Sequence, residues 1–173
     1  EQLAEIGVTD AIVLLEPCAR KTAPAIALAA LAGDAPGNVM LVMPSDHVIK
    51  DEAAFHAAPD AILPNVQDGW MATYGINPTG PETGYGYIQM GSQIESGVHE
   101  VKRFVEKPDA ASAAAMIDGD DHVWNGGIFL FRADTYLGAV AEYAPEMDAA
   151  ARLAMSKAER SGNQLRPDHE SFA

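Results

Sequence analysis

The stretch "NVMLVMPSDHVI", Asn38–Ile49, decides the predicted fold. Its apolar run ends at Pro44 and a polar turn follows at once, a pattern typical of a strand buried on both faces. Two further apolar runs, "AIVLLEP" at 11–17 and "GWMATYGI" at 69–76, lie before and after it, and helical patterns separate the three. Apolar strands that alternate with helices predict an α/β fold, with a mainly parallel mixed sheet flanked by helices.

The segments between these strands carry helix signals. A helix is predicted over 22–32, with Thr22 as its N-terminal cap, because its alanine-rich run is bounded by a capping residue and a glycine. A second helix is predicted to begin at Asp51 and to be interrupted by Pro59 and Pro64, because proline lacks the amide donor that a helix interior needs. Later elements are predicted as helices at 109–117, 135–143 and 145–160 and as a strand at 127–131.

Composition restricts the kind of partner. The 173 residues carry a net charge of −14, which argues against nucleic acid and anionic membranes as partners, since both require clustered cations. One cysteine, Cys18, cannot form an internal disulfide, and the scattered histidines show no zinc spacing, so we expect a reducing, cytoplasmic compartment. We also expect one domain over 1–173, which begins in the middle of a fold.

Two carboxylates follow predicted strands. Ligands of open α/β sheets bind beyond the carboxyl ends of the strands, where Glu16 and Asp46 lie. Asp46 is placed to hold Mg²⁺ against a phosphate, or else to cap a loop. Glu16 can accept paired hydrogen bonds from guanine N1–H and its 2-amino group, or else form a surface ion pair with Arg20 or Lys21.

The stretch "RFVEKP", 103–108, ends a predicted strand on two charged residues and a proline. The proline restricts the backbone of Lys107 and keeps it out of right-handed helical geometry, so that Glu106 and Lys107 are presented at a defined place. They are either ligand-binding groups or a solvated ion pair that leads into the next helix.

Two glycine-containing segments complete the set of candidate sites. "TGYGYI" carries Gly84 and Gly86, where a backbone can approach a ligand closely, although the same pattern suits a tight turn. "WNGG" carries Asn125, whose amide can bind sugar hydroxyls or simply occupy a turn.

Together the segments "LLEPCARKTAPAIALAAL", "LVMPSDHVI", "YGINPTGPETGYGYI", "VKRFVEKPDAASAAAMI" and "VWNGGIFLFRADTYL" resemble the mannose-1-phosphate guanylyltransferases, of the bacterial type often fused to a mannose-6-phosphate isomerase. The resemblance runs up to about Pro145. It implies the Rossmann-like fold of nucleotide-diphospho-sugar transferases. It also implies a Mg²⁺-dependent reaction in the cytoplasm, in which GTP and mannose 1-phosphate give GDP-mannose and pyrophosphate for polysaccharide biosynthesis.

The resemblance also assigns roles to the candidate residues. Glu106 would hold mannose hydroxyls, and Lys107 would meet the sugar phosphate as a catalytic group. Asp46 would bind the metal and thereby act in catalysis. The remaining assignments are sugar contacts by Gly84, Asn125 and Gly126, and nucleotide contacts by Glu16, Arg20 and Thr22.

Two parts of the family pattern have no counterpart in these residues: a glycine-rich loop that cradles the GTP phosphates, and a second metal-binding aspartate. We therefore expect a partial domain, incomplete at its N-terminus and lacking its C-terminal part, without guanylyltransferase activity as an isolated chain. Two other functions stay open, a non-catalytic sugar-phosphate-binding or regulatory module and a metal-dependent glycosyltransferase of similar fold. A homodimer also stays open.

Overall fold

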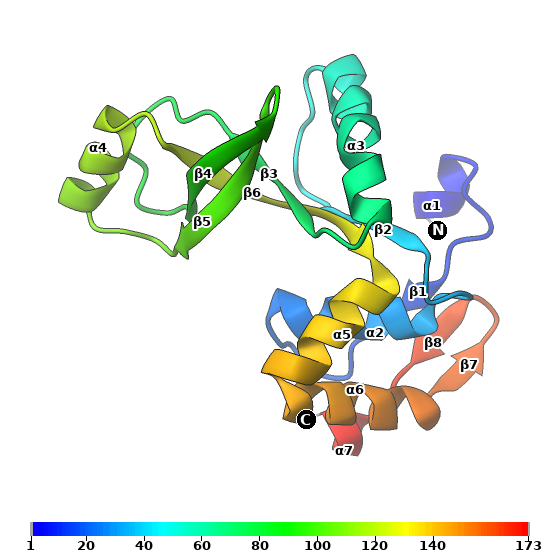
Figure 1. Ribbon diagram of the computed structural model, residues 1–173. Coiled ribbons are helices and arrows are strands. Elements are labelled where there is room, and N and C mark those ends of the chain that lie inside the picture. The colour runs from blue at the N-terminus through cyan, green and yellow to red at the C-terminus, as the bar shows by residue number, and fades with distance from the viewer. Residues whose placement is uncertain (1, 173) are drawn as a thin grey trace. The chain divides into compact units, whose positions relative to one another are not determined.

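The computed structural model describes residues 2–172, whose elements are traced in chain order in Figure 1. The chain divides into two compact units, which we describe separately. The first joins the segment up to Met40 with the segment from Phe131 onward, and the second comprises Leu41–Leu130. Among the described residues, no helix is long and apolar enough to cross a bilayer.

The first unit packs helices against one another beside a small sheet. Its three-stranded sheet has the order β1-β8-β7, with β1 parallel to β8 and β8 antiparallel to β7. The strands are β1 (Val13–Leu14), β7 (Glu159–Ser161) and β8 (Gln164–Arg166), and the helices are α1 (Gln2–Glu5), α2 (Thr22–Ala32), α5 (Ala133–Tyr143), α6 (Pro145–Ser156) and α7 (His169–Phe172).

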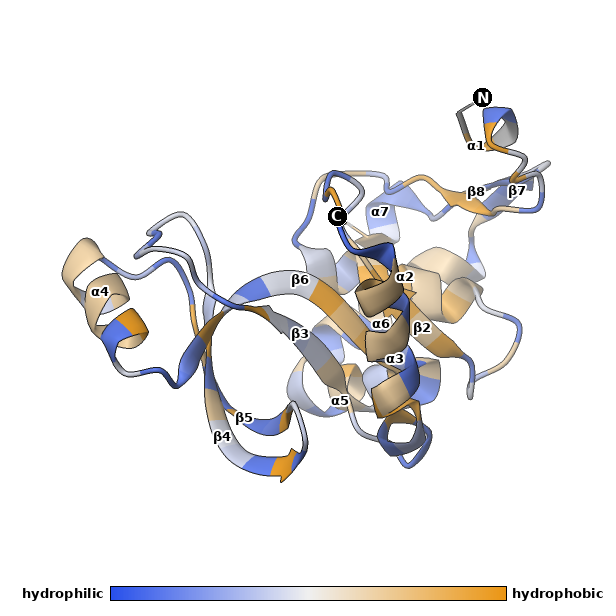
Figure 2. Cartoon of the chain, turned by 90° about the horizontal axis from the view of Figure 1, so that it is seen from above, coloured by the Kyte–Doolittle hydropathy of each residue, from blue (hydrophilic) through white to orange (hydrophobic). Residues whose placement is uncertain are grey.

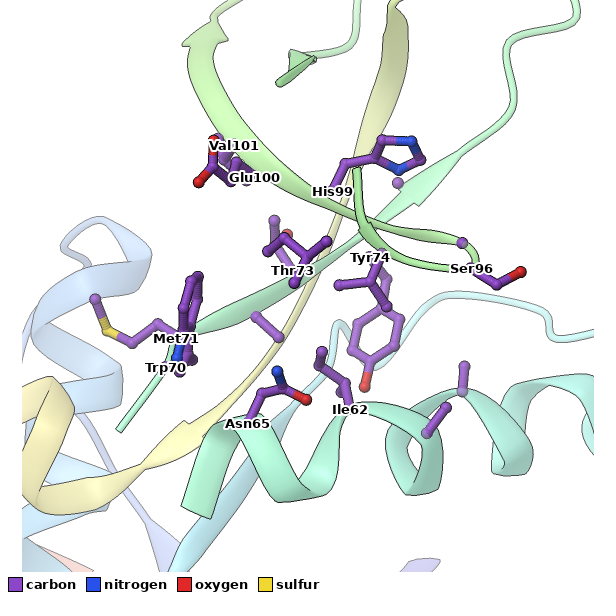
Figure 3. A pocket seen from close by; sticks show the side chains of 17 residues that line it. Ile62, Asn65, Trp70, Met71, Thr73, Tyr74, Ser96, His99, Glu100 and Val101 are labelled. Carbon is purple, nitrogen blue, oxygen red and sulfur yellow. The ribbon is translucent and has the colours of Figure 1, made fainter. Parts of the chain in front are cut away.

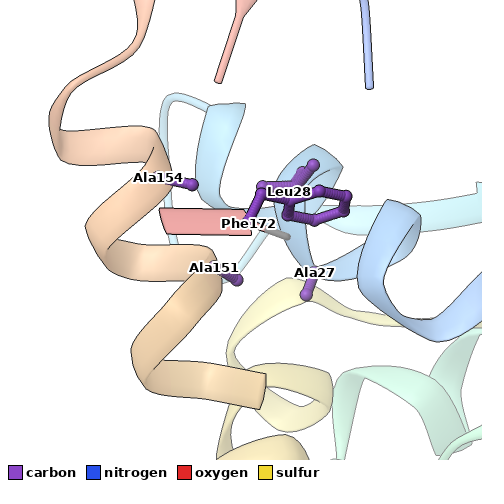
Figure 4. Close-up of a cluster of buried hydrophobic side chains, with 5 residues drawn as sticks. All are labelled: Ala27, Leu28, Ala151, Ala154 and Phe172. Carbon is purple, nitrogen blue, oxygen red and sulfur yellow. The ribbon is translucent and has the colours of Figure 1, made fainter. Parts of the chain in front are cut away.

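The core of the first unit lies between helices. Leu28 is fully buried, and it is surrounded by small side chains from α2 and α6 and by the ring of Phe172 (Figure 4). Because alanine side chains let helices approach closely, the alanine-rich stretch 22–32 forms a buried helix, as predicted. Thr22, however, is the first helical residue and not the cap: Lys21 takes the cap position without a side-chain hydrogen bond. The predicted cap is therefore wrong.

The second unit contains α3 (Glu52–Gln67), β3 (Ala72–Ile76), β4 (Tyr87–Glu95), β5 (Val98–Val105) and α4 (Ala110–Asp118). The five-stranded sheet has the order β2-β6-β4-β5, with β3 also paired to β6; β2 spans Val39–Val42 and β6 spans His122–Arg132. The α/β class is confirmed and the sheet is mixed.

Antiparallel pairing is more extensive than the sequence predicted. The β3–β6, β4–β5 and β4–β6 registers are all antiparallel, and β1–β8 is the parallel pair whose register is described. An apolar run does not give the direction of a strand relative to a neighbour, so the pattern could not distinguish the two. The prediction that β2 is buried on both faces is wrong, because exposed and half-buried residues alternate along it and Leu41 is 40% exposed. Figure 2 shows the strands carrying both apolar and polar residues.

Helix α3 runs unbroken through both of its prolines, so the predicted interruption is wrong. It begins where expected, because the Asp51 carboxylate accepts a hydrogen bond from the Ala54 amide at 2.9 Å. A proline in a helix interior costs about 3 kcal/mol. Val66 of α3 is fully buried and Phe55 and Ile62 are half-buried, and this packing offsets the cost.

A hairpin near the C-terminus was not predicted. Strands β7 and β8 are joined by Gly162 and Asn163, with Gly162 at a φ of 58°. A two-residue Gly-Asn turn is a hairpin signal, so the sequence did contain evidence for this element. The helix before it ends at Ser156, four residues earlier than predicted.

One glycine of β3 lies where a side chain would not fit. A Cβ on Gly75 would overlap the Val123 side chain, with only 2.9 Å to its Cβ. We expect Gly75→Ala to lower the free energy of unfolding by about 1–3 kcal/mol through overpacking, measured by urea denaturation. Adding Val123→Ala should recover part of the loss, whereas Gly80→Ala, which meets open space, should leave stability unchanged. Equal stability of Gly75→Ala and wild type would contradict this packing.

Candidate functional site

Three strands of the second unit bring a glycine, a carboxylate and an amide together. The registers pair Tyr87 with Val105 on β5 and with Trp124 on β6. The residues one step along the chain from these therefore lie side by side: Gly86 just before β4, Glu106 just after β5 and Asn125 within β6. Asn125 N–H donates to the Gly86 carbonyl at 2.8 Å.

Gly86 leaves the space that this arrangement needs. A Cβ there would lie 3.1 Å from Glu106 Oε2 and 3.5 Å from Asn125 Cβ. A Cβ on Gly84, by contrast, would meet nothing within 4 Å. Sequence reasoning selected Gly84 as the backbone contact, and that role stays a prediction. The structure places Gly86 against Glu106 and Asn125, a proximity that only strand register reveals.

Lys107 follows Glu106 with an unusual backbone. Its φ is 42°, in the left-handed region that residues other than glycine rarely adopt, and the next residue is Pro108. Such a conformation stores about 1–3 kcal/mol, and residues that adopt it are enriched at functional positions. The sequence predicted that Lys107 avoids right-handed helical geometry, but gave no sign of a positive φ.

Helix α4 anchors the far end of this segment. The Asp109 carboxylate caps the helix by accepting a hydrogen bond from the Ser112 amide at 2.8 Å. Hydrogen bonds from the Ser112 backbone and hydroxyl hold the pKa of Asp109 below its usual value. Pro108 is buried, while Glu106 and Lys107 are exposed. The two charged residues thus lie between β5 and a capped helix, exposed to solvent.

Asn125 connects this group to the loop after β2. Its side-chain oxygen accepts a hydrogen bond from the Gly127 amide at 3.0 Å. Gly127, at a φ of 65°, lies against Pro44, since a Cβ on it would be 3.4 Å from Pro44 Cγ. The loop that carries Asp46 two residues later therefore runs beside the Asn125–Gly127 segment. Gly126 is buried against the Tyr74 carbonyl.

Asp46 offers one exposed carboxylate in that loop. Within residues 2–172, no three His, Cys, Asp or Glu side chains gather closely enough to hold a metal by themselves. Mg²⁺ typically uses one or two carboxylates and fills its other positions with water and substrate phosphates. A lone aspartate fits that pattern and does not suit a metal site made wholly of protein ligands.

A polar network that the sequence did not reveal ties the same strands together. Arg103 Nε donates to Gln89 Oε1 at 2.9 Å, and Gln89 Nε2 donates to Asp121 Oδ2 at 2.7 Å. The bond from Gln89 is the main reason that the pKa of Asp121 is below its usual value. His122, which is buried, has Nδ1 2.5 Å from Asp121 Oδ1. These contacts hold β5, β4 and the start of β6 in the register that builds the site.

The three predicted nucleotide contacts belong to the first unit. Glu16 follows Leu15, whose amide donates to the Leu165 carbonyl at 2.9 Å and so fixes the end of β1. Arg20 is exposed, and Thr22 begins α2. All three side chains are open to solvent within one short stretch of chain.

Comparison with known proteins identifies the family to which the chain belongs. Residues 1–169 match the model of the family described as nucleotidyl transferase, so the chain belongs to that family. It is 45% identical over 175 residues to the xanthan biosynthesis protein XanB of Xanthomonas campestris, and covers 37% of that protein. It is 43% identical over 181 residues to mannose-1-phosphate guanylyltransferase of Escherichia coli K12, and covers 38% of it.

A solved structure shares the fold. The crystal structure of a protein named mannose-6-phosphate isomerase from Helicobacter pylori aligns with a TM-score of 0.86 and 30% identity. The alignment covers 98% of this chain and 67% of that one. By contrast, the chain spans 37% and 38% of the lengths of XanB and the Escherichia coli K12 protein.

Proposed function

We propose that these residues form part of a mannose-1-phosphate guanylyltransferase, which makes GDP-mannose and pyrophosphate from GTP and mannose 1-phosphate. The observation that carries the proposal is the convergence of Gly86, Glu106 and Asn125, with Lys107 next in the chain. A carboxylate and an amide suit sugar hydroxyls, and an adjacent ammonium suits a phosphate. The names of the two sequence relatives support the same reaction and a place in polysaccharide biosynthesis.

The chemistry follows from the substrates. A phosphate oxygen of mannose 1-phosphate attacks the α-phosphorus of GTP, a new O–P bond forms, and the bond to the β-phosphate breaks to release pyrophosphate. The attacking oxygen is already anionic, so no general base is required. Glu106 and Asn125 orient the sugar, and the Lys107 ammonium offsets phosphate charge, so that catalysis consists of positioning and electrostatic stabilisation.

Mg²⁺ is the proposed cofactor, and Asp46 is the residue that would hold it. When bound, the ion neutralises phosphate charge and brings the phosphates of the two substrates together. The lone, exposed carboxylate of Asp46 fits an ion that takes its other ligands from phosphates and water.

The nucleotide contacts are proposed in the first unit. Glu16 would accept hydrogen bonds from guanine N1–H and its 2-amino group, a donor pair that adenine lacks. Arg20 and Thr22 would contact the rest of the nucleotide. The assignment of Gly84 and Gly126 as sugar contacts also belongs to this proposal, as does a cytoplasmic location, which the single free cysteine supports.

The deciding experiment follows pyrophosphate in a preparation of the longest natural polypeptide that contains these residues. Pyrophosphate that appears only when GTP, mannose 1-phosphate and Mg²⁺ are all present supports the proposal. Sugar transfer from GDP-mannose would instead identify a glycosyltransferase. Binding of mannose 1-phosphate without turnover would identify a binding or regulatory module. The Helicobacter protein bears the name of an isomerase, so interconversion of mannose 6-phosphate and fructose 6-phosphate is measured in parallel.

The two glycines of "TGYGYI" provide a matched test of the sugar site. We expect Gly86→Ala to weaken mannose 1-phosphate binding by about tenfold, because its Cβ displaces the Glu106 carboxylate that holds a sugar hydroxyl. Gly84→Ala meets no protein atom within 4 Å, so it should weaken binding only if the Gly84 backbone itself contacts the sugar. Calorimetric titration of both variants gives the comparison. A loss confined to Gly84→Ala would return the backbone contact to Gly84.

A further inference from the structure

A row of polar residues crosses β4, β5 and β6 beside the proposed sugar site. Gln89 on β4 pairs with Arg103 on β5 and with His122 on β6. The sugar-site residues lie three positions away, each on the same segment of chain as one member of this row: Gly86, Glu106 and Asn125. Any contact that fixes the strands relative to one another at the polar row therefore also fixes them at the sugar site.

Gln89 does not itself contact a sugar bound at that site. Side chains three residues apart on a strand point to opposite faces of the sheet, so Gln89 and Glu106 lie on opposite faces. An effect of Gln89 on sugar binding must therefore act through the register of the strands.

The register at the site rests on few backbone pairs. From Tyr87 to Gln89, β4 pairs regularly with both β5 and β6. Directly after Gln89 the pairing with β5 becomes irregular, and further shifts follow before Glu95. Gln89 is thus the last regular position before the irregular half of the hairpin formed by β4 and β5.

Packing constrains the irregular half of this hairpin only weakly. Residues 92–95 of β4 are exposed. Glu100 and Val101 of β5 line a cavity of about 600 Å³, which α3 and β3 also line (Figure 3). A slip by one residue exchanges the two faces of a strand, which would turn the Glu106 carboxylate away from Asn125.

Two side-chain hydrogen bonds of Gln89 oppose such a slip. Its Oε1 accepts from Arg103 Nε at 2.9 Å, and its Nε2 donates to Asp121 Oδ2 at 2.7 Å. The backbone adds a third link, because the Asp121 carbonyl accepts from the Met90 amide at 2.8 Å. These bonds connect β4 to β5 and to the residue before β6, at the point where regular pairing ends.

The two ends of the Gln89 amide are not interchangeable. The Arg103 guanidinium can only donate, and an ionised Asp121 can only accept, so one orientation of the amide satisfies both. The bond from Gln89 is also the first cause that lowers the pKa of Asp121, which favours its ionised form. A carboxylate at position 89 would lose the donor and place a second negative charge beside Asp121.

We propose that Gln89 is a positioning residue for the sugar site. Its two hydrogen bonds fix the register of three strands and thereby place Glu106 beside Asn125. The effect on sugar binding rests on the proposed function, because it assumes that these two residues hold mannose 1-phosphate. The effect on the register does not depend on that function.

The test is a double-mutant cycle in the longest natural polypeptide that contains these residues. Gln89→Glu and Asp121→Asn each break the bond between the two side chains, from opposite ends. The double variant, Gln89→Glu with Asp121→Asn, reverses the bond, since the new amide donates to the new carboxylate and the wild-type net charge is kept. Gln93→Glu is the matched control, because Gln93 lies on the same strand beyond the polar row and donates to the Glu95 carbonyl.

Amide hydrogen exchange without substrate reports on the register and requires no activity. The Asn125 amide donates to the Gly86 carbonyl across the site. Mass spectrometry should show exchange about tenfold faster at the segment that contains Asn125 in each single variant, and wild-type exchange in the double variant and the control. Wild-type exchange in both single variants, or a double variant that is not restored, would overturn the proposal.

Kinetics distinguish positioning from a loss of folded protein. The KM for mannose 1-phosphate should rise about tenfold in each single variant and return in the double variant, while the KM for GTP should not change. A fall in kcat with both KM values unchanged would show a merely structural role and would overturn the effect on sugar binding. If the wild type releases no pyrophosphate, the guanylyltransferase assignment fails, and the exchange experiment still decides whether Gln89 fixes the register.

Discussion

Replacing Asp46 by Asn should lower the rate of guanylyl transfer by about 100-fold or more. The amide matches the carboxylate in shape but loses the negative oxygen that a hard cation requires. Because Asp46 is exposed and no described metal cluster surrounds it, the fold should not change. The measurement is pyrophosphate release against Mg²⁺ concentration, in the longest natural polypeptide that shows the activity.

The control for this variant is Asp60→Asn, which removes an exposed carboxylate from α3. The two variants therefore have the same net charge. It should turn over like wild type. If Asp46→Asn does the same at every Mg²⁺ concentration, Asp46 is a loop residue and the metal lies elsewhere.

Lys107→Met should weaken mannose 1-phosphate binding by about 1.5–3 kcal/mol, a factor of roughly ten to a hundred. The substitution keeps the aliphatic stem and removes the charge that meets the phosphate. Binding of mannose, which has no phosphate, should be little affected. Calorimetric titration with each sugar gives both affinities.

Lys102→Met removes an exposed cation from β5 and serves as the control. Lys107→Gly adds a second contrast. Glycine adopts a positive φ without strain, so this variant should be as stable as wild type or more so, yet bind the sugar phosphate as weakly as Lys107→Met. If the Lys107 and Lys102 variants bind equally well, the charged pair at this strand end is only solvated surface.

Elements with strong local signals were predictable from the sequence. Helix α2 fills 22–32 as expected, and Asp109 and Asp51 cap helices that begin where the pattern indicated. In each of these helices, the residues that indicate where it begins lie within one short stretch of sequence. The prolines of α3 misled because the cost of a missing hydrogen bond is local, whereas the burial that outweighs it comes from residues distant in sequence.

Motifs selected the candidate site residues, and the structure adds a geometry that the motifs did not contain. Glu106, Lys107 and Asn125 were chosen from motifs, but the motifs do not state that Gly86 is the glycine beside them. That depends on the β4–β5 and β4–β6 registers, which join residues about twenty and forty positions apart. The positive φ of Lys107 likewise occurs in the connection from β5 to α4. Lysine has no preference for this conformation, so the sequence could not predict it.

The prolines of α3 also give that helix mechanical compliance. Pro59 and Pro64 cannot donate to the carbonyls one turn earlier, on Phe55 and Asp60, so two backbone hydrogen bonds of the helix are missing. A helix bends most readily where such hydrogen bonds are absent. Helix α3 is therefore better described as three short, stiff segments joined at two positions where it can bend.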